Sequence, residues 1–305
     1  MVNVYISILN FNGKRNTYEC IESLKKINTQ SISLTILVID NGSKEELGLK
    51  DSEQGNLKIK IIRSERNLGF SGGHNVGIKY ALEKGAEFVL ILNNDTYVDK
   101  NFLKELISAA EKDVKKGILS PKIYFAPGFE FHKDRYRKDE LGKVFWYAGG
   151  IMDWKNVIGH HRGVDEVDVG QFGKKEEVEY ASGCCMLVKK EVFERVGFFD
   201  EKYFLYYEDG DLSMRARKGG FKIMYVPTSV VYHKNAGSAG GSGSILQDYY
   251  ITRNRLFFGF KYASLRAKIA LVKESIKTLF LGRPWQKKGV FDFFTSNLGK
   301  GSFRV

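Results

Sequence analysis

The sequence predicts an α/β fold with a mostly parallel sheet and helices on its faces. Short apolar runs recur in the first part of the chain, at 4–9, 34–39, 58–62 and 88–92, and helical spacing fills two of the gaps between them, at 18–24 and 76–82. Parallel strands that are buried on both faces give continuous apolar runs of this kind, because neither face contacts water.

The later part of the chain has a weaker pattern. Residues 126–180 are rich in glycine, charge and aromatic side chains, and we interpret them as a long excursion or hairpin region on the α/β core. Two strand-like segments follow, at 186–188 and 222–226, and a helix from about 211 to 218 is expected between them. The sequence shows no internal repeat that would suggest another architecture.

The composition is that of a folded globular protein. Of the 305 residues, 43% are hydrophobic and 13% are aromatic, which is too much apolar material for a disordered chain. No apolar run reaches the ~20 residues of a spanning helix, and no basic-then-apolar signal begins the chain. The three cysteines match neither a disulfide framework nor a metal-ligand spacing, so the sequence predicts a reducing, cytoplasmic setting.

Positive charge is concentrated at the C-terminus. Residues 251–305 contain 12 Lys or Arg and only two acids, Glu274 and Asp292, whereas residues 1–250 are nearly neutral. This asymmetry predicts a local anionic partner and argues against a nucleic-acid-binding protein.

A basic amphipathic helix is predicted within this C-terminal extension. Six apolar residues recur there with helical spacing, and Arg266, Lys273 and Lys277 flank them: Leu265, Ile269, Val272, Ile276, Leu279 and Phe280. Such a helix can lie in a membrane interface and attract anionic headgroups. The alternative is that its apolar face packs on the rest of the chain or on a second copy in a homodimer.

Polar side chains follow the predicted strands where each strand ends. Asn10 and Asn12 follow the first strand, Asp40 the second and Asp95 the fourth. Open α/β sheets bind ligands at the carboxyl ends of their strands, so we expect these side chains at one site. Taken alone, Asp40 is also explained by an Asx turn.

A glycine-rich segment, 67–77, precedes the fourth strand. Glycines before a helix let the backbone approach a ligand, and a helix N-terminus attracts phosphate. The segment matches neither a P-loop nor the dinucleotide fingerprint. The alternative is a tight turn and a helix packed closely on the sheet.

Acidic residues cluster at two further places. Asp95 lies beside two asparagine amides, a setting that suits a hard divalent cation or simply caps a turn. Glu208, Asp209 and Asp211 follow three aromatic residues, whose burial can poise a carboxylate as a general base. The alternative there is an acidic first turn of a helix. His233, at a strand end, is a candidate to complete a metal site with Asp95.

In their order along the chain, these segments resemble the inverting glycosyltransferases of family 2, in their rhamnosyltransferase-like bacterial branch. The similar residues span Ser7 to about Phe258 and comprise the segments 9–12, 40–43, 67–77, 92–96, 181–211, 233, 249–250 and 253–254. Each motif is weak alone, but the ordered series is specific.

The resemblance implies a GT-A fold, a nucleotide-diphosphate-sugar donor and a Mg²⁺ or Mn²⁺ ion. Residues 1–250 would form the catalytic domain, with a nucleotide-sugar half (1–125) and an acceptor and catalytic half (126–250), followed by the helical extension 251–305. The residues implied to bind the donor nucleotide are Asn10, Asn12, Asp40, Asn67, Gly69, Gly72 and Asn94.

The resemblance also implies the catalytic roles. Asp95 matches the last position of the family's acidic metal-binding motif, although the two preceding residues here are asparagines. His233 matches a position that can join the metal. Asp209 falls on the catalytic base, with Glu208 beside it. On the acceptor side, the implied residues are Asp211, Arg253 and Asn254.

Together these features predict transfer of a sugar, with dTDP-rhamnose as the favoured donor, to a glycan or a polyprenyl-linked glycan. UDP-hexose and UDP-N-acetylhexosamine stay open as donors, because Asp40 would not distinguish thymine from uracil. The enzyme would be cytoplasmic, with peripheral attachment to the inner face of the cell membrane through residues 251–305. A non-catalytic carbohydrate-binding scaffold on the membrane surface is the alternative, but retention of Asp95 and Asp209 argues against it.

Overall fold

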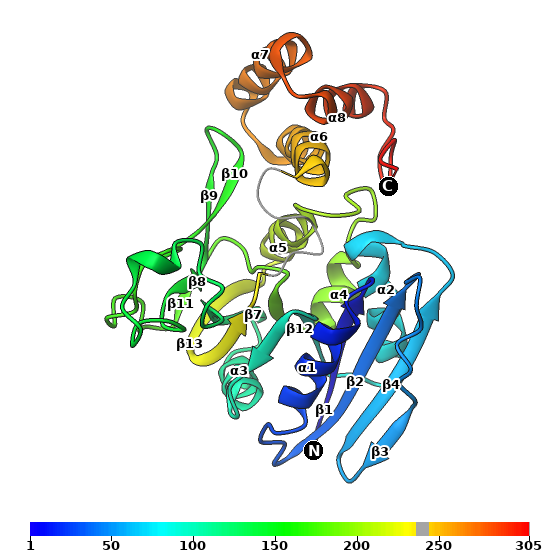
Figure 1. Ribbon diagram of the computed structural model, residues 1–305, viewed down its shortest axis with the longest axis vertical. Coiled ribbons are helices and arrows are strands. Elements are labelled where there is room, and N and C mark those ends of the chain that lie inside the picture. The colour runs from blue at the N-terminus through cyan, green and yellow to red at the C-terminus, as the bar shows by residue number, and fades with distance from the viewer. Residues whose placement is uncertain (236–243, 305) are drawn as a thin grey trace.

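A mixed β-sheet runs through the molecule with helices packed against it, and three more helices stack at one end (Figure 1). The structure is a computed structural model and describes residues 1–235 and 244–304. The sheet order is β11-β13-β7-β12-β5-β1-β2-β4-β3, with β6 on β13 and β8 on β7. Its strands are β1 (Val2–Asn10), β2 (Ile32–Asn41), β3 (Ser52–Gln54), β4 (Leu57–Ser64), β5 (Phe88–Asn93), β6 (Thr96–Val98), β7 (Lys116–Phe125), β8 (Phe145–Tyr147), β11 (Glu176–Glu177), β12 (Cys185–Lys189) and β13 (Lys222–His233).

The α/β fold predicted from the sequence is confirmed. The helices near the sheet are α1 (Lys14–Leu24), α2 (Gly69–Glu83), α3 (Phe102–Glu111), α4 (Lys190–Val196) and α5 (Glu208–Lys218). Strands β4, β2, β1 and β5 are parallel neighbours in that order. The crossover β1–α1–β2 runs one way along the sheet and β4–α2–β5 runs the other, so right-handed crossovers place α1 and α2 on opposite faces. The strand order therefore reverses beside β1, where ligands bind in such sheets.

The continuation of the sheet beyond β5 is antiparallel at first. Strand β12 pairs antiparallel with both β5 and β7, and β13 then pairs parallel with β7. The sequence analysis did not predict β7, because glycine, proline and lysine interrupt its apolar run. Pro121, which has no N–H to donate, pairs with Val226 at a register shift of β13, and such irregularities are where a sheet accepts proline.

Helix α2 begins at Gly69, well before the 76–82 range predicted for it. Two of its glycines lie against β1. A Cβ on Gly73 would lie 2.3 Å from Leu9 Cδ1, and a Cβ on Gly77 would lie 2.6 Å from Ser7 Oγ. These glycines are therefore needed for close packing of α2 on the sheet, as in the alternative interpretation of the 67–77 segment.

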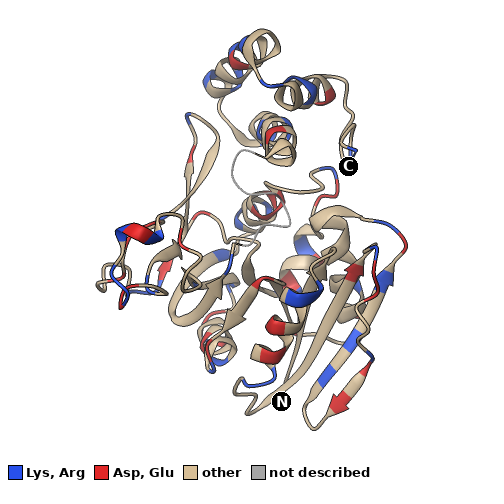
Figure 2. Ribbon diagram, viewed as in Figure 1, with Lys and Arg blue, Asp and Glu red and all other residues tan. Residues whose placement is uncertain are grey.

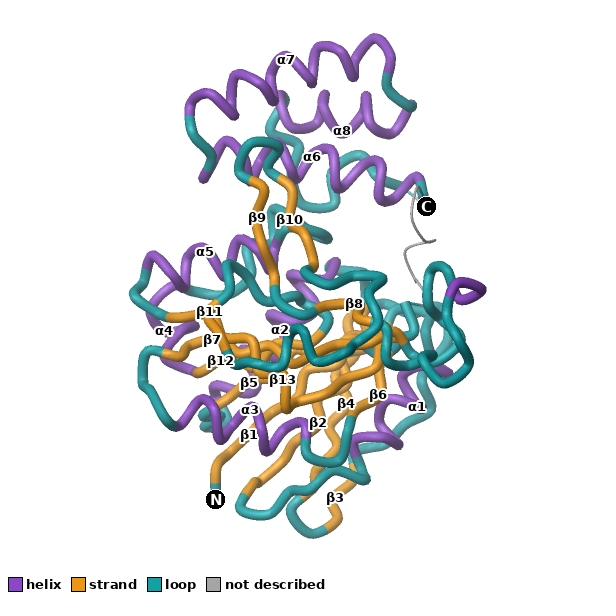
Figure 3. Tube along the Cα trace, turned by 90° about the vertical axis from the view of Figure 1, so that its left-hand side faces the viewer, coloured by secondary structure: helices purple, strands orange, loops and turns teal. Residues whose placement is uncertain are grey.

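The excursion over 126–180 contains a hairpin that reaches the C-terminal helices. The hairpin is β9 (Gly150–Asp153) and β10 (Ile158–His161), and the helices are α6 (Ile245–Tyr262), α7 (Leu265–Leu281) and α8 (Pro284–Phe294). Figure 3 shows the hairpin extending from the sheet toward α6. At its tip the Trp154 ring stacks on Phe258 with centroids 6.1 Å apart, and Arg255 Nε donates to the Asn156 carbonyl at 2.7 Å. Helix α6 begins before residue 251, and the domain boundaries stay a prediction.

Candidate active site

The ends of β1 and β2 form a polar edge, as expected. Asn10 and Asp40 are direct partners in the strand register, and Asn10 Nδ2 donates to Asp40 Oδ1 at 3.1 Å. The Asp40 side chain is buried, and Arg63 Nη1 lies 3.2 Å from its Oδ2. Arg63 was missed by the sequence analysis, because only the register of β4 against β2 places it opposite Asp40. The guanidinium adds a charged donor at the proposed nucleotide edge.

The other predicted donor residues shape the loops around this edge. Asn12 Oδ1 accepts from the Lys44 N–H at 2.9 Å, and Asn67 Oδ1 accepts from Asn41 Nδ2 at 3.0 Å. Asn94 Nδ2 donates to Thr17 Oγ1 at 2.9 Å, so the amide of Asn94 holds the start of α1. Their roles toward a nucleotide stay predictions.

The two predicted glycines lie where α2 begins. Gly69 has φ +74°, and a Cβ there would lie 2.4 Å from the Phe204 carbonyl oxygen. That oxygen accepts the Phe70 N–H at 2.6 Å, so one of the first N–H groups of α2 is already paired. At Gly72, a Cβ would lie 2.9 Å from Leu68 Cβ. Close packing explains both glycines, and their contact with a nucleotide-sugar donor stays a prediction.

Asp95 and His233, which are 138 residues apart, meet in the structure. His233 Nε2 lies 3.1 Å from Asp95 Oδ1, and both side chains are largely buried. Strands β6 and β13 bring them together, since Thr96 pairs with His233 in the sheet. The Trp146 ring lies edge-on to the His233 ring, with centroids 4.5 Å apart. Trp146 lies in the weakly patterned 126–180 region, where nothing in the sequence identified it.

The donor atoms of this pair fit a Mg²⁺ or Mn²⁺ ion. A carboxylate oxygen and an imidazole nitrogen that face each other are ligands such ions accept. Within residues 1–235 and 244–304, no group of three or more His, Cys, Asp or Glu side chains gathers to hold a metal. Asp95 and His233 would thus supply the protein ligands, and a diphosphate and water would supply the rest.

The loop before α5 is backbone-strained. Phe204, Tyr206 and Tyr207 have φ of 66°, 69° and 73°, in the left-handed region that non-glycine residues rarely adopt. Each such residue costs about 1–3 kcal/mol, and such strain persists only where the surroundings hold it. The loop delivers Asp209 to the first turn of α5, where the helix dipole favours negative charge.

Asp209 is half-buried and accepts two backbone hydrogen bonds. The Gly183 N–H donates to Oδ2 at 2.9 Å, and the Gly210 N–H donates to Oδ1 at 2.7 Å. Burial raises the pKa of Asp209 above that of an exposed aspartate, and the two N–H donors limit the rise. A Cβ on Gly183 would lie 2.9 Å from Phe70 Cζ, so glycine fits this turn best. A carboxylate with this pKa is a stronger base than an exposed one.

Glu208, beside Asp209, lies in a more buried environment. Its side chain is buried, and Oε2 has no hydrogen-bond partner among the described residues. Burial raises the pKa of Glu208 well above its usual range, and the charge of Asp209 raises it further. Of the adjacent pair, Glu208 therefore has the stronger tendency to keep its proton, and Asp209 has the stronger tendency to ionise.

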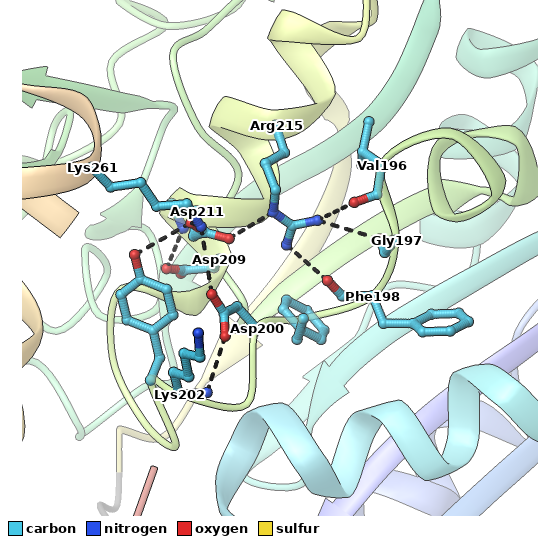
Figure 4. Close-up of polar contacts among 12 residues, drawn as sticks. Val196, Gly197, Phe198, Asp200, Lys202, Asp209, Asp211, Arg215 and Lys261 are labelled. Atoms are coloured by element: carbon cyan, nitrogen blue, oxygen red, sulfur yellow. Dashed lines mark hydrogen bonds and ion pairs between the residues drawn. The ribbon is translucent and has the colours of Figure 1, made fainter. Parts of the chain in front are cut away.

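The structure places Asp211 in a buried ion-pair network (Figure 4). Arg215 Nε donates to its Oδ2 at 2.7 Å, and Lys261 Nζ donates to its Oδ1 at 2.6 Å. The same guanidinium donates to the Phe198 carbonyl at 2.8 Å. Burial alone would raise the pKa of Asp211, but Arg215 and the hydrogen bonds lower it overall. Asp211 thus joins α5 to α6 and is not exposed to an acceptor.

Arg253 and Asn254 are also fully buried, so the structure does not present them to an acceptor. Instead they hold the strained loop from α6. Asn254 Nδ2 lies 2.8 Å from the carbonyls of Tyr203 and Leu205 and 2.9 Å from that of Tyr206. Arg253 Nη2 donates to the Tyr203 carbonyl at 2.9 Å, and its Nε donates to Asn254 Oδ1, also at 2.9 Å. These contacts make both side chains positioning residues for the loop.

We expect Asn254→Ala to lower kcat by about 10–100-fold, because a misplacement of ~1 Å at a reacting group costs about that much. Loss of the amide also removes a buried hydrogen-bond donor, at a cost of about 1–3 kcal/mol of folding free energy. Nucleotide affinity should stay within about threefold, since the proposed nucleotide edge lies on β1 and β2. Thermal melts, calorimetry and turnover measure the three quantities. Asn297→Ala, at an exposed asparagine, is the matched control, and an unchanged kcat in Asn254→Ala would contradict the positioning role.

One turn joins the two carboxylate sites. The Gly183 N–H donates to Asp209, and the carbonyl of the next residue, Cys184, accepts the Asn93 N–H at 2.9 Å, two residues before Asp95. Asp209 and Asp95 therefore flank the same short segment.

Cys20, Cys184 and Cys185 are buried, and burial raises the pKa of the Cys20 thiol to about 12. These thiols are poor nucleophiles, as expected of structural residues.

Solved structures of nucleotide-sugar transferases share this fold. TarS of S. aureus, in complex with UDP-GlcNAc, matches 97% of this chain and 80% of its own with a TM-score of 0.58 and 15% identity. Mannosyltransferase PcManGT of Pyrobaculum calidifontis, in complex with GDP-Man and Mn²⁺, matches 99% and 76% with a TM-score of 0.53 and 13% identity. The fold is thus that of the GT-A glycosyltransferases.

The family is settled by sequence. The family model described as Glycosyl transferase family 2 matches residues 5–197, and the chain belongs to that family. Among its relatives, the dTDP-rhamnosyl transferase RfbF of Shigella flexneri is 28% identical over 76% of this chain and 69% of its own. The N-acetylglucosaminyl-diphospho-decaprenol L-rhamnosyltransferase of Mycobacterium tuberculosis is 26% identical over 68% of each chain.

Proposed function

We propose that this glycosyltransferase inverts the anomeric centre and moves rhamnose from dTDP-rhamnose to a glycan or polyprenyl-linked glycan in cell-surface polysaccharide synthesis. The observation that carries the chemistry is the turn at Gly183 and Cys184, which hydrogen-bonds both the raised-pKa carboxylate of Asp209 and the strand end two residues before Asp95, the partner of His233. The rhamnosyltransferase relatives support the choice of sugar and of a lipid-linked acceptor.

The proposed reaction is a single in-line displacement. The acceptor hydroxyl oxygen forms a bond to the anomeric carbon on the face opposite the diphosphate, and Asp209 takes the hydroxyl proton. The bond from the anomeric carbon to the diphosphate oxygen breaks with its electron pair, and Asp95 and His233 would hold the cation that neutralises the departing charge. Asn10 and Asp40, with Arg63, would orient the nucleotide.

Two alternative functions are distinguished from this one by the nucleotide titration described below. A UDP-hexose or UDP-N-acetylhexosamine donor is favoured by the likeness to a structure that binds UDP-GlcNAc. A carbohydrate-binding scaffold without turnover would keep the fold but has no use for Asp209. The proposal places the enzyme in the cytoplasm, at the inner face of the membrane.

Calorimetric titration with dTDP, UDP and GDP, each with and without Mn²⁺, tests the donor class. We expect dTDP to bind only with the metal and at least about tenfold more tightly than GDP, which is ~1.4 kcal/mol of discrimination. Product analysis after incubation with dTDP-rhamnose and an undecaprenyl-diphosphate glycan then reads the anomeric configuration. Binding of UDP alone would move the assignment to a UDP-sugar, and binding of no nucleotide would favour the scaffold.

A further inference from the structure

Helix α7 exposes its apolar face. Its buried residues are Ala267, Leu271 and Ser275, and Leu271 packs so closely on α6 that a Cβ on Gly259 would lie 2.3 Å from its Cδ1. The six residues of the predicted apolar stripe lie on a different side of the helix. Leu265 is 74% exposed and Phe280 is 76% exposed. Of the other four, Ile269, Ile276 and Leu279 are also exposed and Val272 is half-buried, so the described residues leave most of the stripe uncovered.

The exposed stripe has the geometry of an interfacial helix. At the helical repeat of 3.6 residues, its members fall within a sector of about 100°, as on amphipathic surface helices. The buried side of α7 points elsewhere, toward α6 and α8, so the stripe and the packing face are separate. In the described part of the chain, no helix is both long enough and apolar enough to span a bilayer.

Basic residues without acidic partners border the stripe. Arg266, Lys273 and Lys277 are exposed on one flank, and no carboxylate lies within ion-pair distance of them in residues 1–235 and 244–304. The acid of α7, Glu274, is paired with Arg255 at 2.7 Å. Figure 2 shows Lys and Arg along α7 and α8. The surface is thus apolar in its middle and positively charged at its edge.

We propose that α7 docks in the plane of an anionic lipid bilayer, with the stripe in the acyl boundary and Arg266, Lys273 and Lys277 against the headgroups. The charge of α7 favours an anionic bilayer over a second copy of the chain as the partner of this surface. A second copy would bring the same unpaired cations and no free carboxylate on α7, whereas an anionic bilayer neutralises them. The apolar stripe supplies the buried area that such binding needs.

Vesicle co-sedimentation of the full chain tests this surface. The vesicles contain phosphatidylcholine alone or mixed with phosphatidylglycerol, and no sugar substrate is present, so the result is separate from the proposed transfer reaction. We expect binding to the mixed vesicles, weakened by salt. Ile276→Glu/Phe280→Glu and Lys273→Glu/Lys277→Glu should each weaken binding about tenfold or more. Val114→Glu, at an apolar residue 81% exposed on another part of the surface, is the control and should bind as the parent does.

Melting temperatures and light scattering complete the test. All four replaced side chains are exposed, so both double variants should melt within a few degrees of the parent. Equal binding to both kinds of vesicle, or unchanged binding in both variants, would overturn the proposal. So would a parent protein that is dimeric, binds no vesicles and becomes monomeric in Ile276→Glu/Phe280→Glu, since the stripe would then be an interface between copies.

Discussion

Asp209→Asn should lower kcat by about 10²–10⁴-fold, the range that a positioned general base contributes. The asparagine keeps the size of the side chain, but its single oxygen can accept only one of the Gly183 and Gly210 N–H groups, which donate to different oxygens of the aspartate. One of these hydrogen bonds is lost, and so is the ability to take the proton of the acceptor hydroxyl. Nucleotide affinity with Mn²⁺ should stay within about threefold, because the proposed nucleotide edge lies on β1 and β2 and Asp209 lies on α5.

Glu208→Gln is the matched control for this substitution. Burial and the neighbouring Asp209 charge raise the pKa of Glu208 well above its usual range, which favours the neutral form of the parent side chain. Glutamine reproduces that neutral state, and we expect kcat to stay within about tenfold of the parent. Equal losses in Asp209→Asn and Glu208→Gln, measured by single-turnover kinetics, would show that Asp209 is not the base.

The pH dependence of the reaction rate is a second test of Asp209 as the general base. Asp209 accepts a proton only when it is ionised, so the rate falls as the pH drops through its pKa. Burial raises that pKa above the usual value for aspartate, and the acidic limb should therefore lie at higher pH than an exposed aspartate would give. Asp209→Asn should remove this limb from the residual activity.

Asp95→Ala has the second largest expected effect. It removes the carboxylate that faces His233 Nε2 at 3.1 Å, and with it one of the two protein ligands we assign to the cation. Charge stabilisation by a bound cation is worth several kcal/mol, so kcat should fall at least about 10²-fold. The Mn²⁺-dependent part of nucleotide affinity should disappear in calorimetry.

Asp99→Ala is the matched control, since Asp99 is an exposed aspartate that directly follows β6, where it accepts the Asn101 N–H. It should keep both the nucleotide affinity and its dependence on Mn²⁺. If Asp95→Ala binds nucleotide with the parent's metal dependence, the cation lies elsewhere. Melting temperatures of both variants separate a binding defect from unfolding.

The sequence was sufficient for the fold class and for the grouping of polar side chains at one edge of the sheet. Asn10 and Asp40 could be placed together because parallel strands end at a common edge, and the structure pairs them in register. The order of the motifs along the chain indicated the family before any geometry was known, and the family is confirmed.

Contacts between distant segments could not be predicted in the same way. The approach of His233 to Asp95 depends on β13 pairing with both β6 and β7, and β7 was itself missed. Arg253 and Asn254 stood out in the sequence, yet only the packing of α6 against the 202–206 loop shows that they face backbone carbonyls. A pattern of residue types identifies important positions, but the partner of each side chain is a property of the tertiary structure.

The strained loop before α5 depends on contacts from α6, and this dependence limits how far the chain can be shortened. A protein ending at residue 250 would lose Arg253 and Asn254, and the left-handed residues at 204, 206 and 207 would relax toward ordinary backbone angles. We expect the truncated protein to be inactive, even if α7 and α8 serve only to attach the enzyme to a membrane. Lys261 and Tyr262, at the end of α6, also contact Asp211. We therefore expect the smallest active fragment to extend at least through Tyr262, and a swap of the C-terminal segment between homologues to need that helix together with its own loop.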